Sequence, residues 1–163
     1  MATSAFSTRT ITVEHVTITS GNAFDSVRTK LEGLIPRIDD GIFVLLRYGE
    51  SVRALQELKA GPALSIFGFR DHGTLLTIAR LQRRAIQYDI GNPLTASEMT
   101  RHQLSAGLYA PIRVLLREDS DGVVAFEYDR PVSVFGQFGD DEVDRVAQRL
   151  DQALRSALES AAS

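Results

Sequence analysis

Histidine is the side chain best suited to acid–base chemistry near neutral pH, and two histidines of this sequence stand out by their neighbours. His72 directly follows Asp71, whose carboxylate can fix the tautomer of the imidazole. His102 lies four residues after Glu98, so these two side chains share one face of an expected helix. A cofactor-independent enzyme, such as an isomerase or a lyase, could use His72 with Asp71 or His102 as acid and base.

Each of these residues also has a structural explanation. Asp71 can cap the helix that follows it, with His72 as a hydrogen-bonded turn residue. Glu98 can form a capping box with Thr95, in which each side chain satisfies a free backbone amide. A metal site at Glu98 and His102 would need another ligand from elsewhere, and the chain has no compact ligand motif. No metal or cofactor is therefore expected.

Four polar side chains are candidates for binding a small molecule, namely His72, Tyr88, Asn92 and Tyr109. The turn Gly91–Pro93 presents backbone amides and the side-chain amide of Asn92. It lies near His72 if the strands that precede the two residues are neighbours. We expect a small apolar or mixed ligand between a sheet and the C-terminal helix, where pockets are mostly apolar with a few polar groups.

Two acidic residues on expected strands, Asp89 and Glu127, could converge for acid–base work. They are better explained as solvated sheet positions with Arg113 and Arg117 as cross-strand partners.

The composition describes an ordinary globular chain. Its 163 residues suit a single domain, 1–163, with an ordered core at about 8–160. The fractions of 44% apolar and 24% charged residues argue against a disordered chain. A net charge of −3 gives no basic surface for nucleic acid. The chain has no cysteine, no apolar run of membrane-spanning length and no signal-peptide pattern, so we expect a cytoplasmic protein without a membrane partner.

The first half of the chain predicts a mixture of strands and helices. Residues 38–50 are ambiguous, because the run IFVLL suits either a buried strand or a helical turn. The other expected elements are a strand at 9–19 with an extra residue at Glu14–His15, a helix at 23–35 capped by Asn22, a short helix ending at Gly61, an interior strand at 63–69, a helix or helical turn at 74–82 and a strand at 85–90.

The second half has the clearest periodicity. Residues 111–129 alternate apolar and polar side chains on both sides of the turn DSDG, which predicts an antiparallel hairpin. Residues 140–159 keep one apolar stripe at helical spacing and predict a long helix capped by Asp140. The fold class is α+β, an antiparallel sheet packed by an N-terminal and a long C-terminal helix, with short inserted helices.

Several of these features together resemble the bacterial and fungal family called domain of unknown function 302. They are the Asp71-His72 pair after a strand, the later Gly91–Pro93 turn, the Pro111 entry into a strand and the acidic turn of the hairpin. The resemblance covers roughly residues 63–139. It implies a β-α-β4-α arrangement related to the TATA-binding-protein-like fold, and pairing as homodimers. The family has no settled activity, so the resemblance implies no reaction.

The homodimer expectation also has a sequence basis. The segment 132–138 carries more large apolar side chains than an exposed loop normally leaves in water, including Phe135 and Phe138. These two phenylalanines lie either in a dimer contact or in the core. A dimeric interaction module without a ligand is thus a further alternative to the ligand-binding protein and the enzyme.

Overall fold

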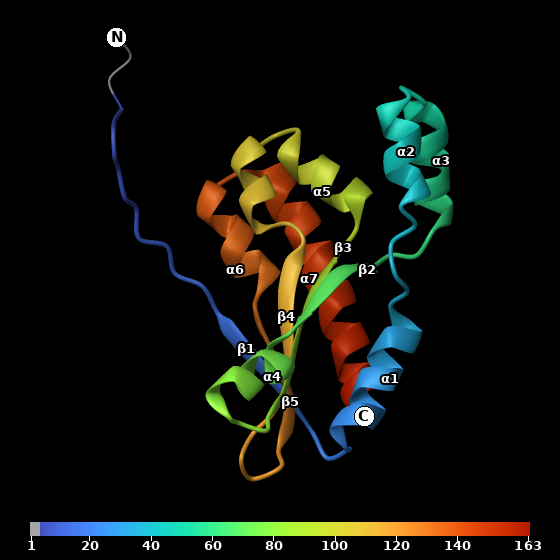
Figure 1. Ribbon diagram of the computed structural model, residues 1–163. Coiled ribbons are helices and arrows are strands. Elements are labelled where there is room, and N and C mark those ends of the chain that lie inside the picture. The colour runs from blue at the N-terminus through green and yellow to red at the C-terminus, as the bar shows by residue number, and fades with distance from the viewer. Residues whose placement is uncertain (1–3) are drawn as a thin grey trace.

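Five strands form one antiparallel sheet in the order β1-β5-β4-β3-β2 in the computed structural model, which describes residues 4–163 (Figure 1). The strands are β1 His15–Ser20, β2 Ser65–Asp71, β3 Arg84–Gly91, β4 Ile112–Glu118 and β5 Val124–Asp129. The α-helices are α1 Phe24–Leu34, α2 Gly41–Arg47, α3 Ser51–Ala60, α4 His72–Leu75, α5 Pro93–Thr100, α6 Pro131–Phe135 and α7 Asp141–Ala162. Short 3₁₀ turns are η1 Leu76–Ala79, η2 Leu104–Tyr109 and η3 Gly136–Phe138.

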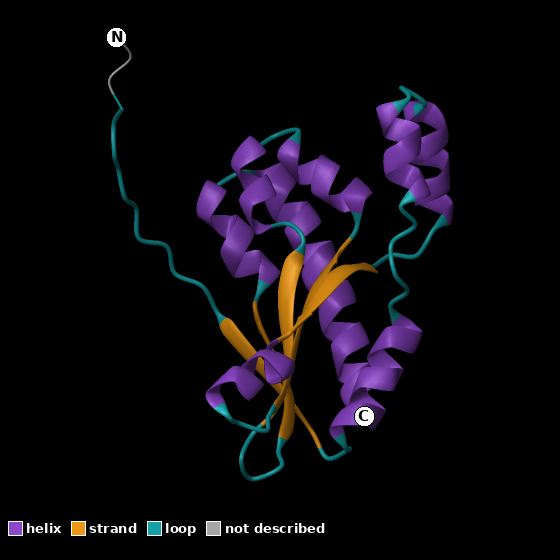
Figure 2. Ribbon diagram, viewed as in Figure 1, coloured by secondary structure: helices purple, strands orange, loops and turns teal. Residues whose placement is uncertain are grey.

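One face of the sheet is covered by α1 and α7 (Figure 2). The hairpin of β4 and β5 explains why: Val114, Leu116 and Phe126 are fully buried on that face, while Arg113 on the other face is exposed. This period of two is the pattern of a sheet with one packed face and one solvated face. The α+β class and the predicted hairpin at 111–129 are confirmed.

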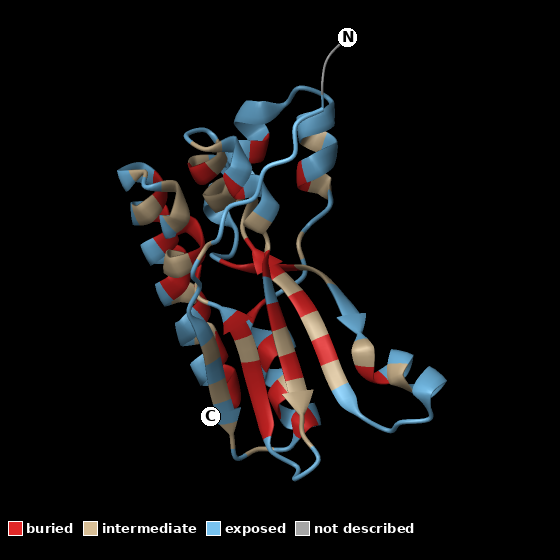
Figure 3. Ribbon diagram, turned by 90° about the vertical axis from the view of Figure 1, so that its left-hand side faces the viewer, coloured by how far each residue is buried: buried red, intermediate tan, exposed pale blue. Residues whose placement is uncertain are grey.

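Helix α7 supplies the largest part of the cover. The Asp140 carboxylate accepts hydrogen bonds from the backbone N–H groups of Glu142 and Val143, so the cap predicted at this residue is confirmed. The helix then runs without interruption to Ala162. Its apolar stripe faces the sheet and α1 (Figure 3), and comprises Val143, Val146, Ala147, Leu150, Leu154 and Leu158.

The N-terminal elements differ from the sequence prediction in two details. The strand starts only at His15: the Glu14 N–H donates to the Ser133 hydroxyl, while its carbonyl accepts from the Arg130 N–H just after β5. From His15 to Ser20 the pairing with β5 is regular, so the strand does not contain the extra residue predicted at Glu14–His15. Asn22 does not cap α1. Its side chain instead donates to the backbone carbonyls of Ala162 and Ser163, and so ties the start of α1 to the end of α7.

Of the ambiguous residues 38–50, the run that contains IFVLL is helical and forms α2, and α2 and α3 form a hairpin that projects from the end of the sheet (Figure 1). Only Ile42 and Ala54 of the hairpin are buried. The predicted helix ending at Gly61 is confirmed as α3.

The prediction of an interior strand at 63–69 is wrong, because β2 is an edge strand. A bulge at Phe67 shifts the register between Ile66 and Gly68, and the segment 36–38 bridges the outer side of the strand at Ile66. Phe67 packs against Phe43 of α2, with ring centroids 6.5 Å apart. The strand has apolar side chains on both sides because the helical hairpin covers one of them.

Phe135 lies in the core rather than in a dimer contact. It is fully buried within the protomer, and the ring of Tyr109 packs edge-on against Phe135 and Phe138 at 6.4 and 6.3 Å. The segment 132–138 forms α6 and η3, which pack on α7. Its large side chains therefore serve the fold of the single chain.

Candidate functional site

Asp71 is a helix cap, as its structural explanation predicted. Its two carboxylate oxygens accept hydrogen bonds from the backbone N–H and the hydroxyl of Thr74, both at 2.9 Å. These bonds from Thr74 lower the pKa of Asp71. His72 is half-buried and starts the four-residue helix α4. Because both carboxylate oxygens of Asp71 are hydrogen-bonded to Thr74, Asp71 is a poor partner for His72 in acid–base catalysis.

The glycine after this pair has a packing role. A Cβ atom at Gly73 would lie 2.4 Å from the carbonyl oxygen of Arg83, so only glycine lets the α4 turn approach the chain before β3 this closely. The Asp71-His72-Gly73 sequence is thus explained by a cap and a close backbone approach.

The antiparallel register separates His72 from the other candidates. Asp71 pairs with Ile86, whereas Gly91 pairs with Ser65 at the opposite end of β2, so His72 and Asn92 lie at opposite ends of the strand pair. His102 is exposed just after α5. Helices α5 and α4 lie at opposite ends of the sheet (Figure 1). The arrangement does not bring His72 and His102 together as an acid–base pair.

Asn92, not Thr95, caps α5. The Asn92 Oδ1 accepts from the backbone N–H groups of Leu94 and Thr95, and its Nδ2 donates to the carbonyls of Pro62 and Ala63. The predicted capping box is therefore wrong. Glu98 forms an ion pair with Arg149 of α7 and takes no part in the cap.

A pocket of about 330 Å³ lies where α5, α2, the end of the sheet and α7 meet; we call it the α5 pocket. It is lined by Phe43, Phe67, Ile90, Gly91, Asn92, Pro93, Thr95, Ala96, Ser97, Met99, Thr100, Ala110, Pro111, Ile112 and Leu150. Ile90 and Ile112 come from the sheet and Leu150 from the long helix, so the pocket extends the boundary between the two.

The polar groups of the α5 pocket are few and uncharged. None of its lining residues is Asp, Glu, Lys, Arg or His. The hydroxyls of Ser97 and Thr100 donate to the carbonyls of Leu94 and Ala96 in their own helix, which leaves their lone pairs as acceptors. This lining, which also contains the hydroxyl of Thr95, suits a neutral, mainly apolar molecule that hydrogen-bonds to hydroxyl groups, and it offers no group for acid–base catalysis.

The other candidate binding residues line different pockets. Tyr109 lines one of only about 60 Å³. Tyr88 lines a pocket of about 260 Å³ between α1 and β2, which we call the α1 pocket. The α1 pocket is formed by Arg28, Glu32, Ile35, Arg37, Ile66, Phe69 and Tyr88. Of the four predicted binding residues, only Asn92 lines the α5 pocket, and His72 lines none of these three.

The two acidic strand residues are ion-paired at the open face of the sheet. Glu127 pairs with Arg117 at 2.6 Å, as predicted, whereas Asp89 pairs with Arg70 of the neighbouring strand at 2.8 Å and not with Arg113. Within residues 4–163, no three or more His, Asp or Glu side chains gather closely enough to hold a metal ion. No helix in this same range combines the length and apolarity needed to cross a membrane.

Sequence reasoning missed most of the α5 pocket. Phe43 lies in the ambiguous run and Phe67 in a bulge, and both are placed by tertiary contacts. One signal was present: Asn92 followed by Pro93 is the pattern of an N-cap with proline at the first helical position, which predicts a helix that starts at the pocket.

One antiparallel sheet with two long helices on a single face, and a pocket at its end, defines an α+β protein with a β-α-β4-α chain order. The chain belongs to the family described as domain of unknown function DUF302, whose model matches residues 44–161. It is similar in fold to the crystal structure of an uncharacterized conserved protein DUF302 from Bacillus stearothermophilus. The TM-score is 0.66 at 13% identity, over 90% of this chain and 97% of that one. Among curated proteins there is no match. The predicted family is confirmed, and neither relation names an activity.

Proposed function

We propose that the protein binds a small, neutral and mainly apolar molecule in the α5 pocket. The supporting observation is the lining itself, in which aromatic and aliphatic side chains surround a few hydroxyl acceptors without any charge. A volume of about 330 Å³ is at the lower end of the roughly 300–1,000 Å³ found for ligand sites. The ligand is accordingly small, with one or two groups that can hydrogen-bond to the hydroxyls.

A blocking substitution tests this proposal. The side chain of Ala96 lines the α5 pocket, so Ala96→Leu fills part of it, and Ala60→Leu at the exposed end of α3 is the matched control. The probe is 2-naphthol, an uncharged ring system with one hydroxyl. We expect it to shift the amide resonances of α5, and Ala96→Leu to weaken binding about tenfold while Ala60→Leu leaves it unchanged. Equal binding by the two variants would place the probe elsewhere and end the proposal.

A homodimer is the second part of the proposal, supported by the contrast between the two sheet edges. The outer edge of β2 is bridged at Ile66 by the segment 36–38. Within residues 4–163 no segment bridges the outer edge of β1 in this way, and the described part of the N-terminal arm leads away from it (Figure 1). Every second residue of an edge strand directs its N–H and C=O outward, which makes it a template for another strand. A second copy can pair β1 with β1 around a twofold axis.

Light scattering on the whole chain tests the dimer. Thr17→Lys places like charges close together across such a β1 pair, and we expect it to convert a dimer into a monomer. Thr10→Lys in the N-terminal arm is the control and should stay dimeric. A monomer mass for the unmodified protein at micromolar concentration would refute the homodimer.

A further inference from the structure

The α1 pocket is a second concave site, and it differs in character from the α5 pocket. It lies on the helix-covered side of the sheet, where α1 leaves the edge strand β2 partly open. The two pockets share no lining residue. Its lining combines three charged side chains, Arg28, Glu32 and Arg37, with the apolar surfaces of Ile66, Phe69 and Tyr88.

The charges in the α1 pocket do not cancel. The Glu32 Oε1 accepts hydrogen bonds from the Arg28 Nε at 2.9 Å and from the Tyr88 hydroxyl at 2.8 Å. Burial alone would raise the pKa of Glu32, but these bonds outweigh it and hold the pKa below its ordinary value, so this residue is an anion paired with Arg28. Arg37 forms no ion pair within 4.0 Å among residues 4–163, although its charge lies near enough to Glu32 to help lower the pKa of that carboxyl. The α1 pocket therefore carries one net positive charge, and this charge is on Arg37 at the rim of the pocket.

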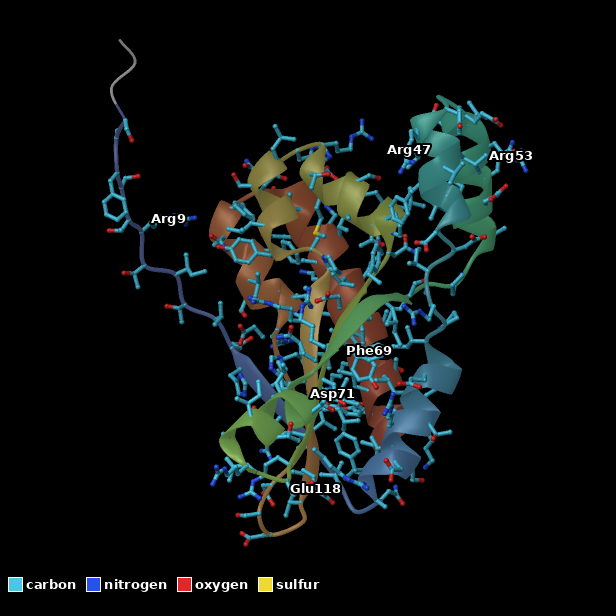
Figure 4. The ribbon with its side chains drawn as sticks, in the orientation of Figure 1. Arg9, Arg47, Arg53, Phe69, Asp71 and Glu118 are labelled. Atoms are coloured by element: carbon cyan, nitrogen blue, oxygen red, sulfur yellow. The ribbon has the colours of Figure 1, made fainter. Side chains whose placement is uncertain are left out.

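The α1 pocket also contains an exposed aromatic side chain, Phe69. The side chain of Phe69 is 45% exposed although it belongs to a strand, and it lies between β2 and α1 (Figure 4). Its ring centroid is 6.2 Å from that of the buried Tyr88, which holds it against the sheet. A flat apolar group can rest on the exposed part of the Phe69 ring, with the buried Ile66 beneath it.

We propose that the α1 pocket binds a small aromatic carboxylate, with its carboxylate on the guanidinium of Arg37 and its ring on Phe69. Guanidinium groups match planar carboxylates in geometry and charge. The volume of about 260 Å³ admits a single substituted ring rather than a larger ligand. This site is independent of the α5 pocket, which takes a neutral molecule.

Binding of benzoate, followed by the amide resonances of the unmodified full chain, tests this assignment. Two relatives of the probe separate its parts: benzamide keeps the ring without the charge, and acetate keeps the charge without the ring. We expect benzoate to shift the resonances of Phe69 and Ile66 with a Kd of about 1 mM or tighter, and benzamide and acetate to bind at least about fivefold more weakly.

The matched variants are Arg37→Gln in the pocket and Arg47→Gln at the exposed tip of the α2–α3 hairpin (Figure 4). Arg37→Gln should weaken benzoate binding at least about fivefold, and added salt should do the same because the contact is charged and partly exposed. Arg47→Gln should change nothing. The assignment is overturned if benzoate leaves Phe69 unaffected, if benzamide binds as well as benzoate, or if both variants weaken binding equally.

Discussion

Helix α7 and the α2–α3 hairpin are both rich in apolar side chains, yet they bury very different shares of them. Along α7 every large apolar residue of the stripe is buried, and the helix is bonded at both of its ends. In the hairpin only Ile42 and Ala54 are buried, while Val44, Leu46, Tyr48, Val52 and Leu55 remain exposed.

The apolar side chains of α7 and of the hairpin have different roles. Burial of the α7 stripe stabilises the fold, since apolar area removed from water contributes about 25 cal/mol per Å². The hairpin contributes little in that way, but its Phe43 forms one wall of the α5 pocket. We therefore expect substitutions in the core to lower mainly the stability of the fold, and substitutions in the hairpin to weaken mainly ligand binding.

The largest expected effect lies in α7. Leu154 is fully buried against the sheet and α1, so Leu154→Ala should lower the free energy of unfolding by about 2–5 kcal/mol through lost burial and a cavity. Leu55→Ala in the exposed part of α3 is the matched control, with an expected loss below about 1 kcal/mol. Urea unfolding of both variants gives the two values directly. Similar losses would mean that the hairpin is as integral to the core as α7.

A smaller loss is expected where α4 approaches β3. Gly73→Ala brings a Cβ against the carbonyl oxygen of Arg83, and the backbone must move to admit it. The expected cost is about 1–3 kcal/mol, as for other overpacked sites. His72→Ala next to it removes a half-buried side chain and serves as the comparison, with a smaller expected loss in the same urea experiment. If His72→Ala is the more harmful change, the imidazole has a structural role that its position does not reveal.

The sequence predicts those elements whose burial follows from their own periodicity. The 3.6-residue stripe of α7 and the twofold alternation of β4 and β5 each specify a face, and the structure buries that face. The run IFVLL of α2 specifies no face, because all five residues are apolar, and it becomes helical through contacts with α3 and Phe67. Long-range contacts of this kind are absent from any local pattern.

The same limit applies to the site. The residue types of the turn at Asn92 predict a binding site there, and Asn92 does line the α5 pocket. The residue type of His72 makes it an equally good candidate, but the strand register places it at the opposite end of β2 from Asn92. Local sequence patterns indicate which residues have the chemistry for a binding site. The strand register and the tertiary packing determine which of these residues lie close together.

A third prediction concerns the buried phenol beneath the α1 pocket. Burial is the main cause that raises the pKa of Tyr88 above its ordinary value of about 10, and the hydrogen bond to Glu32 raises it further. A raised pKa means that the contribution of this group to stability is complete below pH of about 10 and falls above it, as the unfolded chain loses the proton and the folded chain keeps it. Tyr88→Phe should cost about 1 kcal/mol at neutral pH, the value of one hydrogen bond.

The alkaline range provides the check. Urea unfolding at a series of pH values from neutral to strongly alkaline should show a steeper loss of stability in the unmodified protein than in Tyr88→Phe. Tyr128, whose pKa is also raised, chiefly by burial, remains in both proteins and sets the residual slope. Identical slopes would contradict the burial of an un-ionised phenol at position 88.

The smallest effect on stability, and the sharpest test of the comparison, is expected at Phe43. Its side chain is partly exposed in α2, so Phe43→Ala should lower the free energy of unfolding by about 1 kcal/mol or less. The same change removes a wall of the α5 pocket and its contact with the ring of Phe67, so 2-naphthol should bind at least about fivefold more weakly. Val52→Ala, on the exposed side of the hairpin, should affect neither quantity. A large loss of stability with unchanged binding would reverse the roles assigned to the two regions, because the hairpin would then stabilise the fold and the pocket would not need it.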